Sequence, residues 1–346
     1  MTKEISTVIL QKIFKYIIVI LIILFLSYIL FSPNILSYQL IPCNSHIFGK
    51  NFFRLSFPAF NNIFNPSVLK TATGYLCCLR CSTFTQKNLF TYLYGKLCYN
   101  SFILFLEIDE QSNIKIIYPV HKHLKGSLED PRMIEYKNNY IVSASECIDF
   151  SHIFPVLLVY DKSFNLVKRV DYVRTDYYGD RVKDIQKNWC PFIHEDQLYL
   201  HTDSYPEWKV FKIDLDAGHM KKIIDIDVSS LFVLQPNIML RCSTSWKVYD
   251  KNYYICGLHT KTKNIPTIRS ILVLINRKTL CPVYATDILC LEQKTHNRIQ
   301  YLSGLEVDDF HVVLGYGLND SEIVLKKIAK HRLKFVDLKN KSKTLK

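Results

Sequence analysis

Two carboxylates, a proline and a guanidinium stand next to one another at Glu129, Asp130, Pro131 and Arg132. Proline fixes its own φ and favours an extended conformation in the residue before it. We therefore expect Asp130 and Arg132 to be held at the entrance of the strand-like run that begins at Met133. An acid beside a permanent cation can form a reaction centre. The alternative is a surface salt bridge at a turn, which contributes little to stability.

The chain around this motif consists largely of runs of aromatic and β-branched residues, each preceded by a polar turn. This unit recurs five times, with turns near residues 74, 139, 197, 252 and 309. A spacing of roughly 55 to 65 residues is typical of a radial repeat with four short strands per unit. The sequence therefore predicts an all-β fold, a five-bladed β-propeller over residues 56–330, in which residues 322–328 form a closing strand.

Polar or charged residues stand at matching positions of the five units. They are Asn65 and Arg80 in the first unit, Asp130 and Arg132 in the second, Lys187 and Asn188 in the third, Arg241 and His259 in the fourth, and Tyr316 and Asp320 in the fifth. The inner strands of a propeller line a central channel, and the loops at one end of that channel form the site. We therefore expect these residues to gather at one end of the fold.

Five short motifs, by their order and spacing, resemble those of the five-bladed propeller enzymes that act on β-mannosides. These are the inverting mannoside phosphorylases and hydrolases and the related β-1,2-mannosyltransferases. The motifs are Phe64-Asn65-Pro66, Glu129-Asp130-Pro131-Arg132, Lys187-Asn188-Trp189-Cys190-Pro191-Phe192, Ser303-Gly304-Leu305 and Tyr316-Gly317-Leu318-Asn319-Asp320. They span most of residues 60–330. The chain departs from the pattern at residues 241–246, where a turn richer in glycine and proline is expected.

The resemblance implies an enzyme that transfers or cleaves a mannosyl-type sugar, with Asp130 as the general acid that protonates the leaving glycosidic oxygen. Inversion corresponds to attack by water or phosphate from the opposite face of the sugar. Arg132, Lys187 and His259 are then expected to hold an anionic nucleophile or a departing phosphate. The implied ligands are a carbohydrate substrate and phosphate or a sugar-phosphate donor, and no cofactor is expected.

The resemblance also assigns the remaining polar residues. Asn65, Asn188 and Asp320 suit sugar hydroxyls, and Trp189 or Tyr316 suits the apolar face of a sugar. Asn188 and Trp189 are equally compatible with packing between blades, and this alternative stays open.

Two functional questions remain open at this stage. The sequence does not separate transfer from phosphorolysis or hydrolysis, although a tethered chain is more typical of glycan-building transferases. A glycan-binding or scaffold propeller without catalysis is the alternative to an enzyme. That alternative predicts that Asp130 and Arg132 pair with each other and face no cavity.

The N-terminal part of the chain has the pattern of a membrane anchor. No charged residue lies between Tyr16 and Gly49, and Lys3, Lys12 and Lys15 precede this stretch. The centre of this stretch, residues 17–31, is almost wholly apolar, and with its neighbours it reaches the roughly 20 residues that span a bilayer. The basic residues before it place the N-terminus in the cytoplasm. We expect a cytoplasmic tail at 1–13, a transmembrane helix at 14–36 and a stem at 37–55. A cleaved signal peptide is the rival interpretation.

These boundaries describe a type II membrane protein whose propeller lies on the lumenal or extracellular side, followed by a loose basic tail at 331–346. The net charge of +13 would suit a polyanion. However, the aromatic residues lie in strand-like runs rather than among lysines and arginines, and no nucleic-acid-binding motif occurs. We therefore expect a solvated basic surface and no nucleic-acid partner.

The eleven cysteines are scattered along the chain. Cys78 and Cys81 form a lone C-x-x-C pair without a second pair or a histidine at zinc spacing, so we expect no metal site. Most of the cysteines lie in apolar runs, where a buried thiol is expected. A lumenal location would allow some of them to pair, and Asn340 in Asn-Lys-Ser could then carry a glycan.

Overall fold

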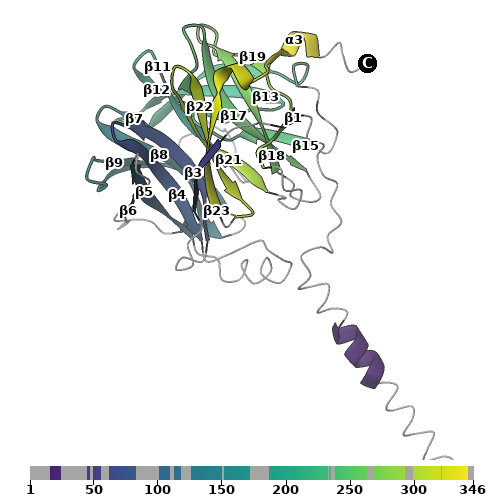
Figure 1. Ribbon diagram of the computed structural model, residues 1–346. Helices are drawn as coiled ribbons and strands as arrows, with labels where there is room; N and C mark the ends of the chain where they lie inside the picture. The colour runs from purple at the N-terminus through teal and green to yellow at the C-terminus, as the bar shows by residue number, and fades with distance from the viewer. Residues whose placement is uncertain are drawn as a thin grey trace, which may run out of the picture.

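The computed structural model describes fourteen segments of the chain, and every structural statement below concerns these residues. They are 16–24, 45–46, 50–55, 62–82, 101–109, 113–117, 126–149, 152–171, 187–232, 234, 238–262, 268–292, 299–320 and 322–341. Apart from residues 16–24, two short helical stretches and the turns, they form mainly β-strands, which are arranged around a common centre (Figure 1).

Four of the five sheets in the described residues contain four strands each. Sheet I contains β3 (Asn62–Thr71), β4 (Gly74–Ser82), β5 (Ser101–Asp109) and β6 (Ile114–Ile117). Sheet II contains β7 (Ser127–Tyr136), β8 (Asn139–Asp149), β9 (His152–Tyr160) and β10 (Leu166–Asp171). Sheet III contains β11 (Cys190–His194), β12 (Gln197–Asp203), β13 (Glu207–Asp214) and β14 (His219–Asp227). Sheet V contains β21 (Gln300–Val307), β22 (His311–Leu318), β23 (Glu322–Ala329) and β2 (Lys50–Leu55).

Sheet IV is larger, with eight strands. Its members are β15 (Ile238–Cys242), β16 (Lys247–Val248), β17 (Tyr253–Thr262), β18 (Ile268–Asn276), β19 (Pro282–Ala285), β20 (Leu289–Cys290), β1 (Ser45–His46) and β24 (Val336–Asp337). The five expected turns lie directly before β4, β8, β12, β17 and β22, for example at Lys137 and at Asp196. The expectation of an all-β, propeller-like fold is therefore confirmed.

Five hydrophobic clusters hold neighbouring sheets together, and each contains side chains from two sheets. Phe105 and Val142 join sheets I and II. Leu157 and Phe211 join II and III, Phe192 and Trp246 join III and IV, Leu272 and Leu314 join IV and V, and Leu325 and Cys77 join V and I. The clusters thus close a ring, because each sheet buries both of its faces against its neighbours.

Both ends of the predicted propeller need correction. The stem expected at 37–55 contains β2, which pairs antiparallel with β23 and completes sheet V. The free outer edge of β23 offers unpaired backbone groups, which this early segment satisfies. The basic tail expected to be loose from residue 331 continues through β24, which pairs with β19, and α3 (Leu338–Lys341). Leu338 is buried in the cluster between sheets III and IV.

The first strands of sheets I and II share a bulge at one position. The pairing register shifts between Phe64 and Ser67 in sheet I and between Glu129 and Arg132 in sheet II. Asn65 has φ 53° and Asp130 has φ 49°. Asn and Asp tolerate this left-handed conformation, and the proline that follows each has no N–H to withdraw from the ladder. The extended conformation expected for Asp130 is therefore wrong, because the bulge overrides the influence of Pro131.

Hydroxyl groups beside these bulges bond one sheet to the next. Ser67 Oγ accepts a hydrogen bond from the backbone N–H of Met133 at 2.7 Å, and Ser303 Oγ donates to the carbonyl of Pro66 at 3.0 Å. Gly304 lies at the same junction, where a Cβ would stand 2.5 Å from the Pro66 carbonyl oxygen. The centre of the ring is therefore packed so closely that one inner position admits only glycine.

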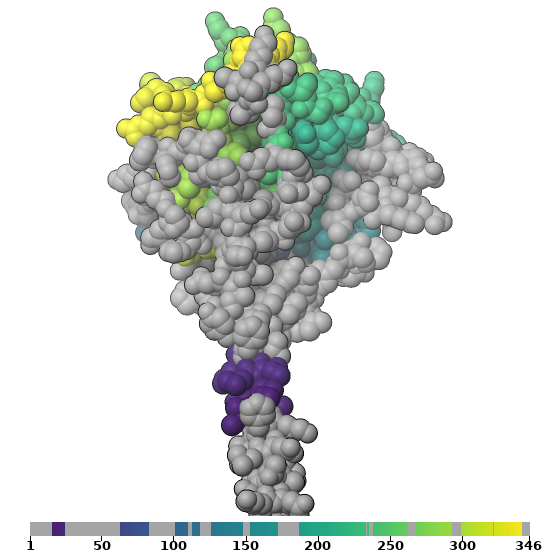
Figure 2. Space-filling view, turned by 90° about the vertical axis from the view of Figure 1, so that its right-hand side faces the viewer, coloured from purple at the N-terminus to yellow at the C-terminus, as the bar shows by residue number. Residues whose placement is uncertain are grey.

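The segment expected to span a membrane is described only in part. Residues 16–24 are helical, their side chains are exposed, and they lie apart from the sheets (Figures 1 and 2). No helix among the described residues is both long and apolar enough to cross a bilayer. The other residues of the predicted 14–36 helix lie outside the described part of the chain.

Candidate active site

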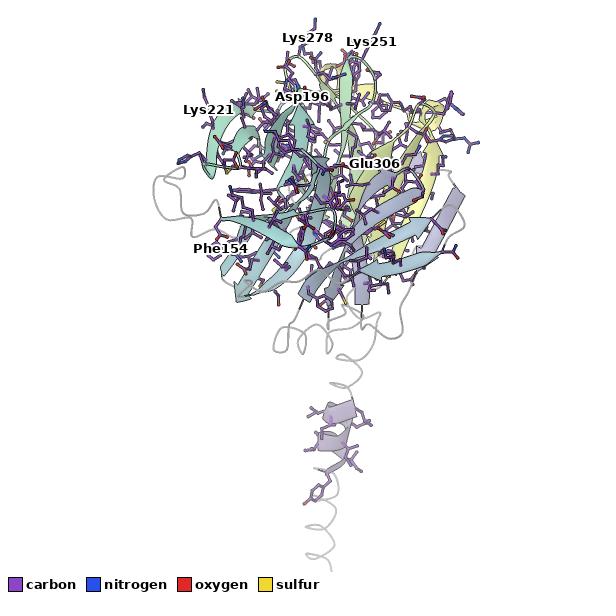
Figure 3. The ribbon with its side chains drawn as sticks, turned by 90° about the vertical axis from the view of Figure 1, so that its left-hand side faces the viewer. Phe154, Asp196, Lys221, Lys251, Lys278 and Glu306 are labelled. Atoms are coloured by element: carbon purple, nitrogen blue, oxygen red, sulfur yellow. The ribbon has the colours of Figure 1, made fainter. Side chains whose placement is uncertain are left out.

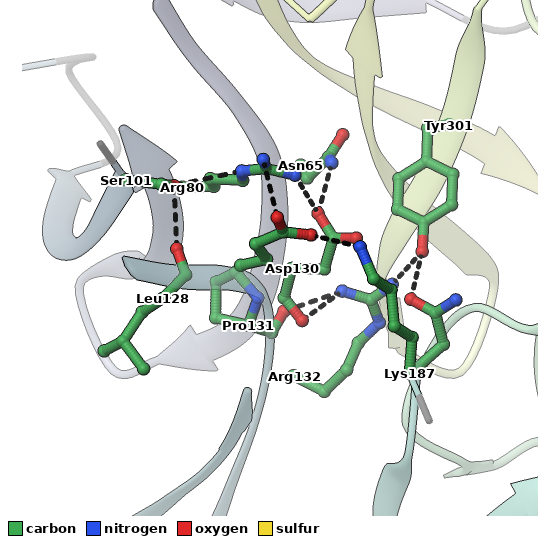
Figure 4. Close-up of polar contacts among 11 residues, drawn as sticks. Asn65, Arg80, Ser101, Leu128, Asp130, Pro131, Arg132, Lys187 and Tyr301 are labelled. Atoms are coloured by element: carbon green, nitrogen blue, oxygen red, sulfur yellow. Dashed lines mark hydrogen bonds and ion pairs between the residues drawn. The ribbon is translucent and has the colours of Figure 1, made fainter. Parts of the chain in front are cut away.

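The two ends of the ring differ in their chemistry. Asp196 and Lys251, in the turns after the first strands, lie at the end far from residues 16–24 (Figure 3). The bulges that contain Asn65 and Asp130 lie toward the opposite ends of their strands. Five of the candidate residues meet there, as the close-up of their polar contacts shows (Figure 4): Asn65, Arg80, Asp130, Arg132 and Lys187.

Asp130 lies at the centre of the cluster, and 11% of its side chain is exposed. Its carboxylate accepts hydrogen bonds from Asn65 Nδ2 at 2.8 Å and from an Arg80 guanidinium nitrogen at 2.9 Å. Burial favours the neutral acid, but Arg80, Arg132 and Lys187 oppose it and hold the pKa of Asp130 well below its usual range. Asp130 is therefore ionised in the free site.

Glu129 forms the second carboxylate of the cluster. It bonds Lys187 Nζ at 2.6 Å and faces Arg80 at 3.5 Å. Its pKa is also lowered, because the two cations outweigh the effect of burial. Arg80 is fixed in turn by Ser101, whose Oγ accepts from Arg80 Nε at 3.1 Å and donates to the Leu128 carbonyl. Glu129, which had no role in the sequence analysis, thus positions Lys187.

Arg132 does not hold an anion, contrary to the sequence-based expectation. Its side chain is fully buried, and one guanidinium nitrogen donates to the backbone carbonyls of Asp130 and Pro131 at 2.9 and 3.0 Å. The other donates to the hydroxyl of Tyr301 at 2.5 Å. Tyr301 donates onward to Asn188 Oδ1 at 2.8 Å. Arg132 therefore clamps the bulge that presents Asp130.

Two other expected binding residues are buried in packing positions. Tyr316 is fully buried between sheets, and its hydroxyl donates to Glu292 at 2.7 Å. Trp189 packs in the cluster between sheets II and III. Neither residue presents an aromatic face to a ligand. Asn188 has φ 65° and is 7% exposed, so its bond to Tyr301 supports the packing alternative for this residue.

Sheet IV contributes a group of basic side chains. Arg241 on β15 stands opposite His259 on β17, and Lys261 follows two residues later on the same strand. Within the described residues no carboxylate lies within ion-pair distance of Arg241 or Lys261. Burial, with Arg241 and Lys187 nearby, lowers the pKa of Lys261. Burial and the neighbouring Arg132 and Arg241 lower that of His259 to about 3, so His259 is neutral.

Asp320 is the third carboxylate of the site, at the end of sheet V's second strand. It is 9% exposed and has φ 53°. Burial raises its pKa to about 6, and the neighbouring Asp130 and Glu129 add to this effect while Arg80 and Lys261 oppose it. The structure therefore brings together Asn65, Arg80, Asp130, Lys187 and Asp320, with Arg241 and His259 on the sheet IV side.

Sequence reasoning missed Tyr301 and Lys261. Tyr301 lies two residues before the Ser303-Gly304-Leu305 motif, so its place on an inner strand was the available signal. Lys261 follows His259 at a spacing of two, which in a strand puts both side chains on one face. A single polar residue within an aromatic run gives no stronger indication in the sequence that it belongs to a site.

The cysteines and the metal question can be addressed for part of the chain. The nine cysteines in the described residues are free thiols, and seven of them are buried. Burial raises the pKa of Cys77 to about 12 and that of Cys81 to about 11, so these thiols stay protonated. No group of three or more His, Cys, Asp or Glu side chains in the described segments has a metal-binding arrangement.

No protein-family model and no curated protein matches this chain by sequence. Solved structures do match. A glycosyl hydrolase from Bacteroides ovatus aligns with a TM-score of 0.56 and 12% identity, covering 86% of this chain and 95% of that one. The β-1,2-mannobiose phosphorylase from Listeria innocua, in complex with β-1,2-mannobiose, aligns with a TM-score of 0.57 and 11% identity, covering 80% and 94%.

A third match comes from glycoside hydrolase family 130, a family of mannoside phosphorylases that contains hydrolases of β-1,2-mannosidic linkages in Candida mannan. It aligns with a TM-score of 0.59 and 10% identity, covering 80% of this chain and 86% of that one. The chain thus has the propeller-like fold of glycoside hydrolases and phosphorylases. The group of proteins that its motifs resemble is also the group to which its fold is similar.

Replacing Tyr301 by Phe tests the clamp around Arg132. The change removes the acceptor for a buried guanidinium and the donor to Asn188, so we expect a loss of about 2–3 kcal/mol in the free energy of unfolding. Chemical denaturation measures this. Tyr249→Phe is the control, because no hydrogen bond of the Tyr249 hydroxyl occurs in the described part of the chain. Equal stability of both variants would contradict the clamp.

Replacing Asp320 by Asn tests the buried carboxyl through pH. The pKa of Asp320 is raised in the folded state. Its contribution to the free energy of unfolding is therefore fully present below its pKa in the unfolded chain, about 4, and is lost as the pH rises through about 6. Asn cannot ionise, so the variant should gain on the order of 2–3 kcal/mol relative to wild type between pH 4 and pH 8. Urea unfolding at both pH values measures the gain, and a pH-independent difference would refute it.

Proposed function

We propose that this chain is a glycoside-active enzyme that cleaves or transfers a mannosyl-type sugar. The observation that carries the proposal is the convergence of Arg80, Asp130, Lys187 and Asp320 from four sheets at one end of the ring. Paired carboxylates beside cations are the groups that glycosidic bond cleavage uses. Fold similarity to mannoside phosphorylases and hydrolases supports the sugar class. We also take sheet IV as the fourth of five blades, since five clusters close the ring.

Phosphate is the ligand that best fits the basic groups of the site. Arg241 and Lys187 both contribute to the lowered pKa of Lys261. Neither Arg241 nor Lys261 has an acid partner within the described residues. An oxyanion would replace the missing counter-charge. Phosphorolysis is thus the reaction that this geometry favours. A sugar-phosphate donor of a transferase would use the same cations, so dependence of turnover on inorganic phosphate distinguishes the reactions.

Asp130 has the position of a general acid but lacks the proton in the free site. It is ionised because Arg80 and Lys187 lie close to it. An oxyanion bound beside Lys187 would offset part of this positive charge and raise the pKa of Asp130. We therefore propose that Asp130 becomes an acid only when the anionic ligand and the sugar are both bound, and that it stays ionised with the anion alone.

The non-catalytic alternative predicted that Asp130 and Arg132 pair with each other and face no cavity. The first half of this prediction does not match the contacts, and the second half stays a prediction. The carboxylate of Asp130 instead bonds Asn65 and Arg80, while the Arg132 side chain bonds two backbone carbonyls and Tyr301. The acid is thus paired with Arg80 of sheet I rather than with its neighbour Arg132.

We further propose that residues 14–36 anchor the chain in a membrane, with the propeller on the lumenal or extracellular side. Two observations support this. The apolar side chains of the helical residues 16–24 are exposed, from 40% at Ile18 to 71% at Tyr16. Three lysines precede the segment and none follows it before Lys50.

Asp130→Asn is the variant that tests the catalytic proposal. Asn tolerates the left-handed backbone of this position, so the fold should survive. Loss of the acid should reduce turnover by on the order of 100-fold or more. The assay is a panel of β-mannosides with and without phosphate. Asp309→Asn, an exposed change of the same charge in the turn after β21, should keep wild-type activity. Full activity of Asp130→Asn would contradict the assignment.

The anchor is tested by alkaline extraction of membranes from cells that express the full chain. An anchored chain should remain with the membranes, because alkaline washing releases only peripheral proteins, and a chain starting at residue 45 should be released. Attachment of a glycan at Asn340 reports the side of the membrane. Release of the full chain would exclude the anchor.

A further inference from the structure

The three carboxylates of the site differ in how their charge is compensated. Glu129 has Lys187 at 2.6 Å, and Asp130 has Arg80 at 2.9 Å. Asp320 has neither a hydrogen bond nor an ion pair within 4 Å in the described part of the chain, although it is only 9% exposed. A buried carboxylate without a partner is costly to ionise, so the three acids do not share one protonation state.

The groups that face Asp320 come from three strands. Arg80 on β4 and Lys261 on β17 favour its ionised form, whereas Glu129 and Asp130 on β7 disfavour it. Burial outweighs the two cations, and the pKa of Asp320 lies at about 6. The pKa values of Glu129 and Asp130 are lowered. Asp320 is thus the acid of this cluster that titrates close to neutral pH.

The protonation of Asp320 depends on Lys261, a cation to which an anionic ligand would bind. Lys261 lies near Arg241, Lys187 and Asp320, and burial already lowers its pKa. An oxyanion beside Lys261 would offset the positive charge that favours ionised Asp320 and would add a negative charge of its own. Both changes favour the neutral carboxyl.

We propose that Asp320 takes up a proton from solvent when a doubly charged oxyanion binds beside Lys261 and Arg241. The inference deepens the proposed function and rests on its anion pocket. No covalent bond changes in this step: one proton leaves the solvent and one carboxylate becomes a carboxyl. The anion-bound site then contains a proton that the free site lacks above pH 6, when a departing sugar oxygen requires one.

The experiment is calorimetric titration of the full chain with sulfate, which does not itself titrate between pH 6 and 8. Repeating the titration at pH 7 in buffers of different ionisation enthalpy gives the number of protons taken up. Wild type should take up between about half a proton and one proton per sulfate, and its affinity should fall up to about tenfold per pH unit above pH 6.

Asp320→Asn removes the titrating group. Asparagine tolerates the left-handed backbone of this position, which has φ 53°. This variant should bind sulfate with proton uptake near zero and with a weaker pH dependence than wild type. Asp309→Asn, with the same charge change on the exposed turn, should behave like wild type. Thermal unfolding of each variant confirms that the fold is retained.

The outcomes separate the inference from the function on which it rests. Sulfate binding with the same proton uptake in wild type and in Asp320→Asn would place the proton elsewhere and overturn the inference alone. Sulfate binding without proton uptake in wild type would do the same. Absence of sulfate binding would overturn the anion pocket of the proposed function together with this inference.

Discussion

The structure depends on a guanidinium that no water reaches. Arg132 is fully buried at the junction of sheets II, III and V, and a buried cation is tolerated only when hydrogen bonds and a counter-charge replace its hydration. The carbonyls of Asp130 and Pro131 and the hydroxyl of Tyr301 supply the hydrogen bonds. Ionised Asp130 supplies the nearby negative charge. The same residue that fixes the bulge of β7 therefore also helps to keep the acid at its tip deprotonated, so structure and electrostatics at this site cannot be varied independently.

One backbone device, repeated with different side chains, builds the site. Asn65 and Asp130 each have a left-handed conformation near the start of an inner strand, where the pairing register shifts. A bulge turns one side chain out of the alternation of the strand, which aims these residues at one another instead of into the clusters between sheets. Because the device recurs, substituting one side chain changes chemistry without changing the path of the chain. In the first sheet the side chain is an amide, and in the second it is an acid.

The sequence was informative where a pattern repeats and silent where a residue acts alone. The five polar turns predicted the ring, and the positions of Asn65, Arg80, Lys187 and Asp320 followed from their phase in the repeat. The burial of Arg132 and Tyr316 could not be predicted, because the type of a residue does not tell whether its side chain points into the packing between sheets or towards the site. Asp130 was expected to be extended since only local sterics were considered, whereas ladder pairing across β7 and β8 decided its conformation. β2 was missed because residues 50–55 can be recognised as a strand only by the edge of β23.

The pairing of β2 with β23 has a consequence for the order of assembly. The strand at residues 50–55 is among the first parts of the body to be synthesised, and its partner at 322–329 is among the last. About 270 residues separate the two, a contact of very high sequence separation whose closure is slow. Sheet V therefore stays open until translation has passed its final strand. A product truncated before β23 lacks the partner of β2, so it retains an unpaired strand edge that the full chain does not have.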